Sequence, residues 1–159
     1  MSYQAVILTV SDSCAAGTRT DTSGPAIRAM LENAGFAVQA MQTVPDKEGQ
    51  ISAAIVHACD ILQADLVVTT GGTGLSPCDV TPEATLAVLD REIRAIPVAM
   101  WVEGLKSTPR AMLSRAVAGI RGHTLVLNVP GSEKAARENL GAVVATLDHA
   151  LRMLAGGGH

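Results

Sequence analysis

The chain has 159 residues, 48% of them hydrophobic and 17% charged, which suits one globular domain and argues against a disordered chain. A formal net charge of −3 and an aromatic content of only 2% argue against nucleic-acid binding, which relies on cationic patches and base-stacking rings. Three cysteines without C-x-x-C spacing predict neither a disulfide framework nor a zinc site. No apolar run reaches the roughly 18 residues of a membrane span, and no basic leader precedes the first strand, so we expect no membrane partner and a cytoplasmic location.

The first half of the chain alternates apolar runs with helical patterns. Residues 4–10 form an apolar, β-branched run that predicts a buried strand, and the polar residues 11–23 predict a loop. A helix is expected to begin at Ser23, whose hydroxyl would cap it, and to end at Gly35. The remaining elements expected in this half are a weaker strand over residues 36–44 and a helix over residues 47–61.

The second half begins with a short apolar strand, residues 65–70, that leads into Gly71-Gly72-Thr73-Gly74. Thr81-Pro82-Glu83 predicts a helix start with Thr81 as the N-cap, because Pro and Glu both favour the first turn. The further expected elements are a helix over residues 96–105, a short strand over 116–120, a strand over 124–129 and a final helix over 133–154 that Ser132 caps.

Strands that alternate with helical patterns are typical of βαβ units and of a parallel sheet with both faces covered. The predicted fold is therefore α/β, a three-layer α/β/α arrangement with a mostly parallel sheet. We expect a single domain over residues 1–155 and a flexible tail over residues 156–159.

Three acidic residues follow the first three predicted strands. Asp12, Asp46 and Asp79 would therefore lie at the carboxyl edge of the sheet, where ligands of open α/β sheets bind. The glycine loop 71–74 and the turn Pro130-Gly131-Ser132 would lie at the same edge, where their backbone N–H groups suit an anion. Carboxylates beside an anion require a bridging cation, so this edge predicts magnesium with a nucleotide phosphate.

Each signal has a simpler interpretation as well. The glycine loop fits a tight turn, Asp12 an Asx turn, Asp46 a cap of the next helix and Asp79 a solvated loop acid. The histidines lack ligand spacing. A locally basic stretch fits either solvated charges or an anion contact; it comprises Lys106, Arg110, Arg115 and Arg121.

The order of the motifs also resembles that of a known protein family. TVSDSCAAG, DTSGP, VPD, TTGGTG, DVTPEAT, TP-x-AMLSR, GIRG and NVPGS occur in the order of the MogA/MoaB family, which residues 5–154 resemble. That family comprises molybdopterin adenylyltransferases and their relatives, including the G domains of gephyrin and of plant Cnx proteins. The resemblance implies a molybdopterin-binding fold, a homotrimer, and AMP transfer from Mg-ATP to molybdopterin with release of pyrophosphate. It also implies a molybdenum-insertion protein or domain as the partner that uses the product.

The resemblance assigns roles to particular residues. Asp46 and Asp79 match the two functional acids, which we expect to hold magnesium during catalysis. The matching substrate-binding residues are Ser11, Asp12, Gly71, Gly72, Thr73, Gly74, Ser114, Arg115, Pro130, Gly131 and Ser132. The chain departs from the family at Lys47, Cys78 and Gly104, where the family usually has Glu, Arg and Ser.

Adenylyl transfer is the predicted function, and it needs no general base because a phosphate monoester is already ionised. Two other classes fit part of the pattern. The first is a non-catalytic molybdopterin-binding relative that acts as a carrier or scaffold. The second is a doubly wound nucleotide-binding or phosphatase domain, which would need neither the pterin nor a trimer.

Overall fold

The computed structural model describes residues 2–157, and its centre is a six-stranded sheet with the strand order β2-β1-β3-β6-β5-β4. Neighbours from β2 to β6 are parallel, whereas β5 is antiparallel to β6 and β4 is antiparallel to β5. The mostly parallel sheet is therefore confirmed. The strands are β1 (Gln4–Val10), β2 (Ala37–Val44), β3 (Leu66–Thr70), β4 (Arg91–Glu92), β5 (Ala118–Arg121) and β6 (Thr124–Val129).

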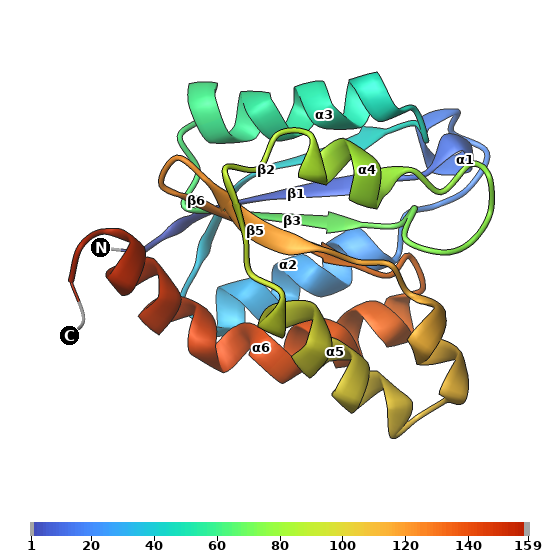
Figure 1. Cartoon of the computed structure of the whole chain (residues 1–159). Coiled ribbons are helices and arrows are strands. Elements are labelled where there is room, and N and C mark those ends of the chain that lie inside the picture. Colours follow the sequence, from blue (N-terminus) through green and yellow to red (C-terminus); the bar gives the residue numbers. More distant parts are fainter. Residues whose placement is uncertain (1, 158–159) are drawn as a thin grey trace.

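Helices cover both faces of this sheet, which confirms the three layers (Figure 1). One layer holds α3 and α4, and the other holds α2, α5 and α6. The helical segments are α1 (Asp12–Ala15), α2 (Ser23–Asn33), α3 (Glu48–Val56) with a π-helical extension η1 (His57–Ile61), α4 (Thr81–Leu86), α5 (Ala95–Leu105), the 3₁₀ helix η2 (Pro109–Leu113) and α6 (Glu133–Leu154). No helix within residues 2–157 is long and apolar enough to cross a membrane.

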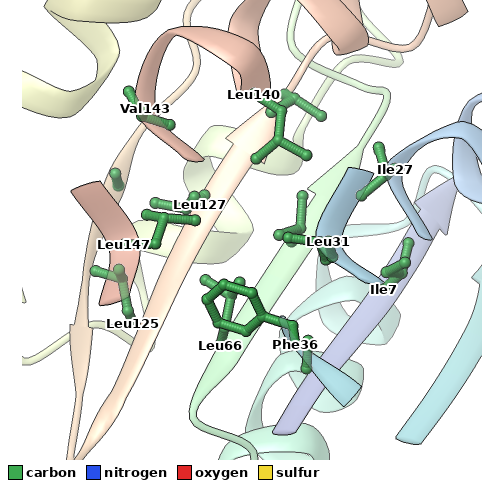
Figure 2. Packing of buried hydrophobic residues seen from close by; sticks show 14 of the residues in the cluster. Ile7, Ile27, Leu31, Phe36, Leu66, Leu125, Leu127, Leu140, Val143 and Leu147 are labelled. Carbon is green, nitrogen blue, oxygen red and sulfur yellow. The ribbon is translucent and has the colours of Figure 1, made fainter. Parts of the chain in front are cut away.

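The central strands β3 and β6 are buried along their whole length, and side chains on the two faces of the sheet contribute to two cores. In β1, Ile7 packs into the core beneath α2 and α6, whereas Leu8 packs into the core beneath α3. Figure 2 shows the first core, where Leu127 of β6 lies near Leu140 and Leu147 of α6. Burial on both faces leaves only the strand ends free to form a site.

The helix ends show where local pattern was sufficient and where it was not. Gly35 ends α2 with φ of +93°, and the Ser132 hydroxyl caps α6 by accepting from the N–H of Ala135, both as predicted. The predicted cap of α2 was wrong: Asp21 Oδ1 accepts from the Gly24 N–H at 3.0 Å, and Ser23 is already helical. Thr81 is likewise the first helical residue of α4 and not its cap.

Two further expectations need correction. Residues 11–23 are not entirely loop, because the Ser11 hydroxyl accepts from the N–H of Cys14 and caps the one-turn helix α1. The antiparallel strand β4 was not predicted, because two exposed residues carry no apolar alternation. Of the expected tail over residues 156–159, Gly158 and His159 lie outside the described residues.

Candidate functional site

A cavity of about 680 Å³ lies at the carboxyl edge of the parallel strands. It is lined by the ends of β1, β3 and β6, by the segment between α1 and α2, and by residues of η2 and α6. It brings together all but two of the predicted site residues, namely Ser11, Asp46, Gly71, Gly72, Thr73, Gly74, Asp79, Ser114, Pro130, Gly131 and Ser132. The two that do not line it are Asp12 and Arg115.

The glycine loop 71–74 passes between the ends of β1 and β6. Gly71 has φ of +103° and donates its N–H to the carbonyl of Val129 at 3.1 Å. A Cβ at Gly71 would collide with the carbonyl oxygen of Val10, and one at Gly72, where φ is +69°, would collide with Thr81 Oγ1. Glycine is thus required by the backbone geometry of the loop itself.

Both predicted catalytic acids lie against this loop. Asp46 Oδ1 is 3.2 Å from the position that a Cβ would take at Gly72. Asp79 Oδ2 is 2.9 Å from the corresponding position at Gly74. The missing side chains therefore leave room for two carboxylates beside the backbone of the loop.

Each acid is anchored through one oxygen. Asp46 Oδ2 accepts from the N–H of Asp12 at 2.9 Å, and the N–H of Asp46 donates to Asp12 Oδ1 at 2.8 Å. Asp79 Oδ2 accepts from the N–H of Ser76 at 3.0 Å. Among the described residues, no hydrogen bond reaches the other oxygen, Oδ1, of either acid.

These contacts decide between the interpretations of the acids. Asp46 does not cap α3, because the N-cap position belongs to Lys47 and has no side-chain hydrogen bond. Asp12 stands outside the cavity and holds Asp46 through the reciprocal pair of bonds. Asp79 belongs to a tight turn in which its own N–H donates to the carbonyl of Ser76 at 2.9 Å.

The electrostatics of the acids favour a cation. Partial burial raises the pKa of Asp46, the N–H of Asp12 opposes that rise, and the charges of Asp12 and Asp79 add to it. Like charges that repel across a cavity are relieved by a positive ion between them. No cluster of three or more His, Cys, Asp and Glu able to hold a metal is found within residues 2–157.

Two arginines that line the cavity were not among the predicted site residues. Arg19 comes from the segment after α1, and Arg110 comes from η2. Within the described part of the chain, neither guanidinium forms an ion pair with a carboxylate. Arg110 belongs to the basic stretch for which an anion contact was one of two interpretations of the sequence. For Arg19, the only signal of a role in the site was its position in the loop after the first strand.

A polar network at the strand ends was also missed. Thr9 of β1 donates to Asp21 Oδ2 at 2.7 Å, and Thr70 of β3 donates to the carbonyl of Pro130 at 2.8 Å. Ser23 Oγ connects these two contacts, because it lies 3.3 Å from Asp21 Oδ1 and 3.1 Å from Thr70 Oγ1. The DTSGP motif, which contains Asp21 and Ser23, was the available signal for this network.

The departures from the family pattern have different consequences. Gly104 lies on α5 in the cavity wall, and a Cβ there would be 2.9 Å from the Cβ of Ala111. Glycine thus allows η2 to pack closely on α5. Cys78 is exposed and does not line the cavity.

The fold and the site define a three-layer α/β domain with a cavity, lined by a glycine loop, acids and arginines, at the carboxyl edge of its parallel strands. Residues 6–149 match the family described as "Probable molybdopterin binding domain", and the chain belongs to this family. A solved structure of the molybdopterin biosynthesis enzyme MoaB from Thermus thermophilus is 47% identical and superposes with a TM-score of 0.92, with 98% of each chain covered. The expected molybdopterin-binding fold is thereby confirmed.

Curated relatives differ in their overall length. Molybdopterin adenylyltransferase from Helicobacter pylori is 36% identical over 154 residues, which cover 94% of this chain and 86% of the relative. Gephyrin from Dictyostelium discoideum is 40% identical over 158 residues, which cover 93% of this chain and 22% of the relative. The chain therefore spans less than a quarter of gephyrin and most of the adenylyltransferase.

Proposed function

We propose that the protein is a molybdopterin adenylyltransferase that transfers AMP from ATP to molybdopterin and releases pyrophosphate. The observation that carries this proposal is the placement of Asp46 and Asp79 against Gly72 and Gly74 in one cavity. Two acids beside a glycine loop suit a magnesium-bound polyphosphate. Relatives that carry the name molybdopterin adenylyltransferase match most of the chain and support the same activity.

The two acids fit Mg²⁺ by their chemistry. Magnesium takes oxygen ligands and is usually held by one or two carboxylates together with substrate phosphates. Asp46 and Asp79 would hold it through the oxygens that their backbone hydrogen bonds do not use. When bound, Mg²⁺ neutralises the charge of the phosphates in the transition state.

The remaining groups position and neutralise the substrates. The glycine loop, with α6 beginning nearby at its Ser132 cap, offers backbone N–H groups to an anion, and Arg19 and Arg110 add positive charge at the cavity wall. The terminal phosphate of molybdopterin attacks the α-phosphorus of ATP in line. A new P–O bond forms as the bond to the β-phosphate breaks, and its electrons leave with pyrophosphate. Positioning and electrostatic stabilisation supply most of the catalysis in such a transfer.

A direct assay tests the activity and separates it from the alternatives. The protein is incubated with molybdopterin and Mg-ATP, and adenylylated molybdopterin and pyrophosphate are measured by mass spectrometry. Formation of both products supports the proposal. Molybdopterin binding without turnover would identify a non-catalytic relative, and ATP hydrolysis without pterin binding would identify a nucleotide-binding or phosphatase domain.

Assembly and partners belong to the same proposal. We infer a homotrimer, and exposed apolar side chains on α5 and η2 support self-association, with Val102 57% and Met112 63% exposed. Light scattering that showed only monomers at micromolar concentration would contradict it. The adenylylated product would pass to a molybdenum-insertion protein, and use of ATP supports the expected cytoplasmic location.

A further inference from the structure

The side chain of Arg115 joins the two ends of the loop that carries Asp79. Its Nε donates to the carbonyl of Gly74 at 2.8 Å, and its Nη2 donates to the carbonyl of Asp79 at 2.7 Å. Its main-chain N–H donates to the carbonyl of Thr73 at 2.8 Å. Arg115, a single residue that follows η2, therefore holds both ends of the 74–79 loop.

Glu83 completes the arrangement from the first turn of α4. The Nη1 of Arg115 donates to Glu83 Oε1 at 3.1 Å and to Oε2 at 2.7 Å, and this contact lowers the pKa of Glu83. The two side chains are 37% and 44% exposed, so their ion pair by itself contributes little to stability. What the pair supplies is orientation, because Glu83 fixes the plane of the guanidinium.

All three guanidinium nitrogens of Arg115 are thus engaged by protein oxygens, and the side chain does not line the cavity. The family resemblance implies a substrate contact for Arg115, whereas here its guanidinium binds the 74–79 loop and Glu83 outside the cavity lining. The free cations at the cavity wall are Arg19 and Arg110 instead, neither of which forms an ion pair among the described residues.

The conformation of the loop controls the carboxylate of Asp79. That carboxylate accepts from the N–H of Ser76 within the same loop, and it lies against Gly74 at one end of it. A change in the separation of the loop ends would move the carboxylate relative to Asp46, which is anchored separately on Asp12.

We propose that Arg115 is a positioning residue that sets the distance between the two cation-binding acids by bridging the carbonyls of Gly74 and Asp79. This role rests on the adenylyl transfer proposed above and deepens it. It requires the forked geometry of a guanidinium, because a lysine ammonium carries the same charge on a single atom and cannot bridge two carbonyls and a carboxylate at once.

The test compares Arg115→Lys with the matched variant Arg121→Lys. Arg121 makes the same kind of contacts, with Nε and Nη2 on Asp60 and Nη1 on the carbonyl of Val88, and it does not line the cavity. Glu83→Gln is a milder third variant that leaves the two carbonyl contacts of Arg115 in place. Thermal melting records any general loss of stability.

Three measurements are made on each variant: the magnesium concentration for half-maximal single-turnover product, Mn²⁺ binding with ATP by electron paramagnetic resonance, and amide exchange of residues 74–79. For Arg115→Lys we expect the affinity for the cation to fall about tenfold, equivalent to about 1.4 kcal/mol. We also expect faster exchange in the loop, near-normal molybdopterin affinity, and partial recovery of the rate at high magnesium. Glu83→Gln should change the same quantities less, and Arg121→Lys should leave them unchanged.

Two outcomes overturn the positioning role. One is unchanged cation affinity and loop exchange in Arg115→Lys, and the other is weakened molybdopterin binding with normal cation affinity, which would make Arg115 a substrate ligand. If the wild-type protein forms no adenylylated product, the proposed activity fails. The Mn²⁺ and exchange measurements still decide the role of Arg115 in that case.

Discussion

The buried faces of the sheet and its carboxyl edge follow opposite rules. On the faces, side chains such as Ile7 and Leu127 are fully buried among other apolar groups and stabilise the fold by packing. At the edge, Gly71 and Gly72 take left-handed conformations, and partial burial, together with the charges of Asp12 and Asp79, raises the pKa of Asp46. Groups at the edge that suit a charged ligand therefore lower the stability of the fold locally.

The acids give the sharpest test of this difference. Asp46→Asn and Asp79→Asn retain the shape of the side chain and remove its charge, so each should lower adenylyl transfer by about 100-fold or more. For Asp46→Asn, stability at neutral pH should be unchanged or slightly higher, because the raised pKa of Asp46 means that its charge is unfavourable in the folded state. Single-turnover assays with magnesium titration and thermal melting check both parts. Normal turnover of both variants at low magnesium would contradict the assignment of Asp46 and Asp79 as magnesium ligands.

A substitution on the buried face should show the reverse behaviour. Leu127→Ala would leave a cavity beneath α6 and lower the free energy of unfolding by about 3 kcal/mol. The rate per folded molecule should stay close to wild type, because Leu127 packs in the core and does not line the cavity. Urea denaturation and the activity of the folded fraction provide the measurement. A large loss of activity in fully folded protein would show that the two regions are coupled.

The cavity arginines should have a smaller effect than the acids. Arg19→Gln and Arg110→Gln each remove a cation that lines the cavity, and we expect the Kd or KM for an anionic substrate to rise about tenfold. Since neither is in an ion pair within residues 2–157, folding stability should not change. Arg94→Gln serves as a matched control, because its side chain is 87% exposed and lies outside the cavity. If all three variants had the wild-type affinity, Arg19 and Arg110 would be solvated charges that do not contact the substrate.

The smallest expected effect is a shift in the pH profile. Asp46 must be ionised to hold a cation, so activity should fall as pH falls through its pKa, which lies above the usual value. Asp12→Asn removes one of the repelling charges and should move this acid limb to lower pH. Stability has the opposite sign: a raised folded-state pKa means that the contribution of Asp46 weakens as pH rises from 3.8 through its folded value. If the acid limb of the activity profile were the same in Asp12→Asn and in the wild type, a group other than Asp46 would be responsible for it.

The candidate site shows which parts of function were predictable from local pattern. The glycine loop and the acids Asp46 and Asp79 were predicted to lie at one edge because parallel strands deliver their carboxyl ends there, and the structure places them together at that edge. Arg19 was missed as a site residue because its spacing does not distinguish a ligand-binding residue from a loop residue. Asp21 was missed although it begins the DTSGP motif, because that motif was interpreted only as a helix start and a family signature. The structure shows that Asp21 anchors Thr9 and the start of α2, and that Arg19 lines the cavity.

The amino-acid sequence alone determined the order of the strands and helices apart from the short elements α1 and β4, the two-sided burial of the sheet, and the edge at which the candidate site lies. These features depend on periodicity and on residues adjacent in the chain, so they are visible without coordinates. Only the tertiary structure decided the pairing of β4 with β5 and the contacts of Asp12 and Arg115. Those features depend on contacts between residues far apart in the chain, such as Asp12 with Asp46 across 34 residues and Arg115 with Asp79 across 36. Such contacts follow from how the whole domain packs.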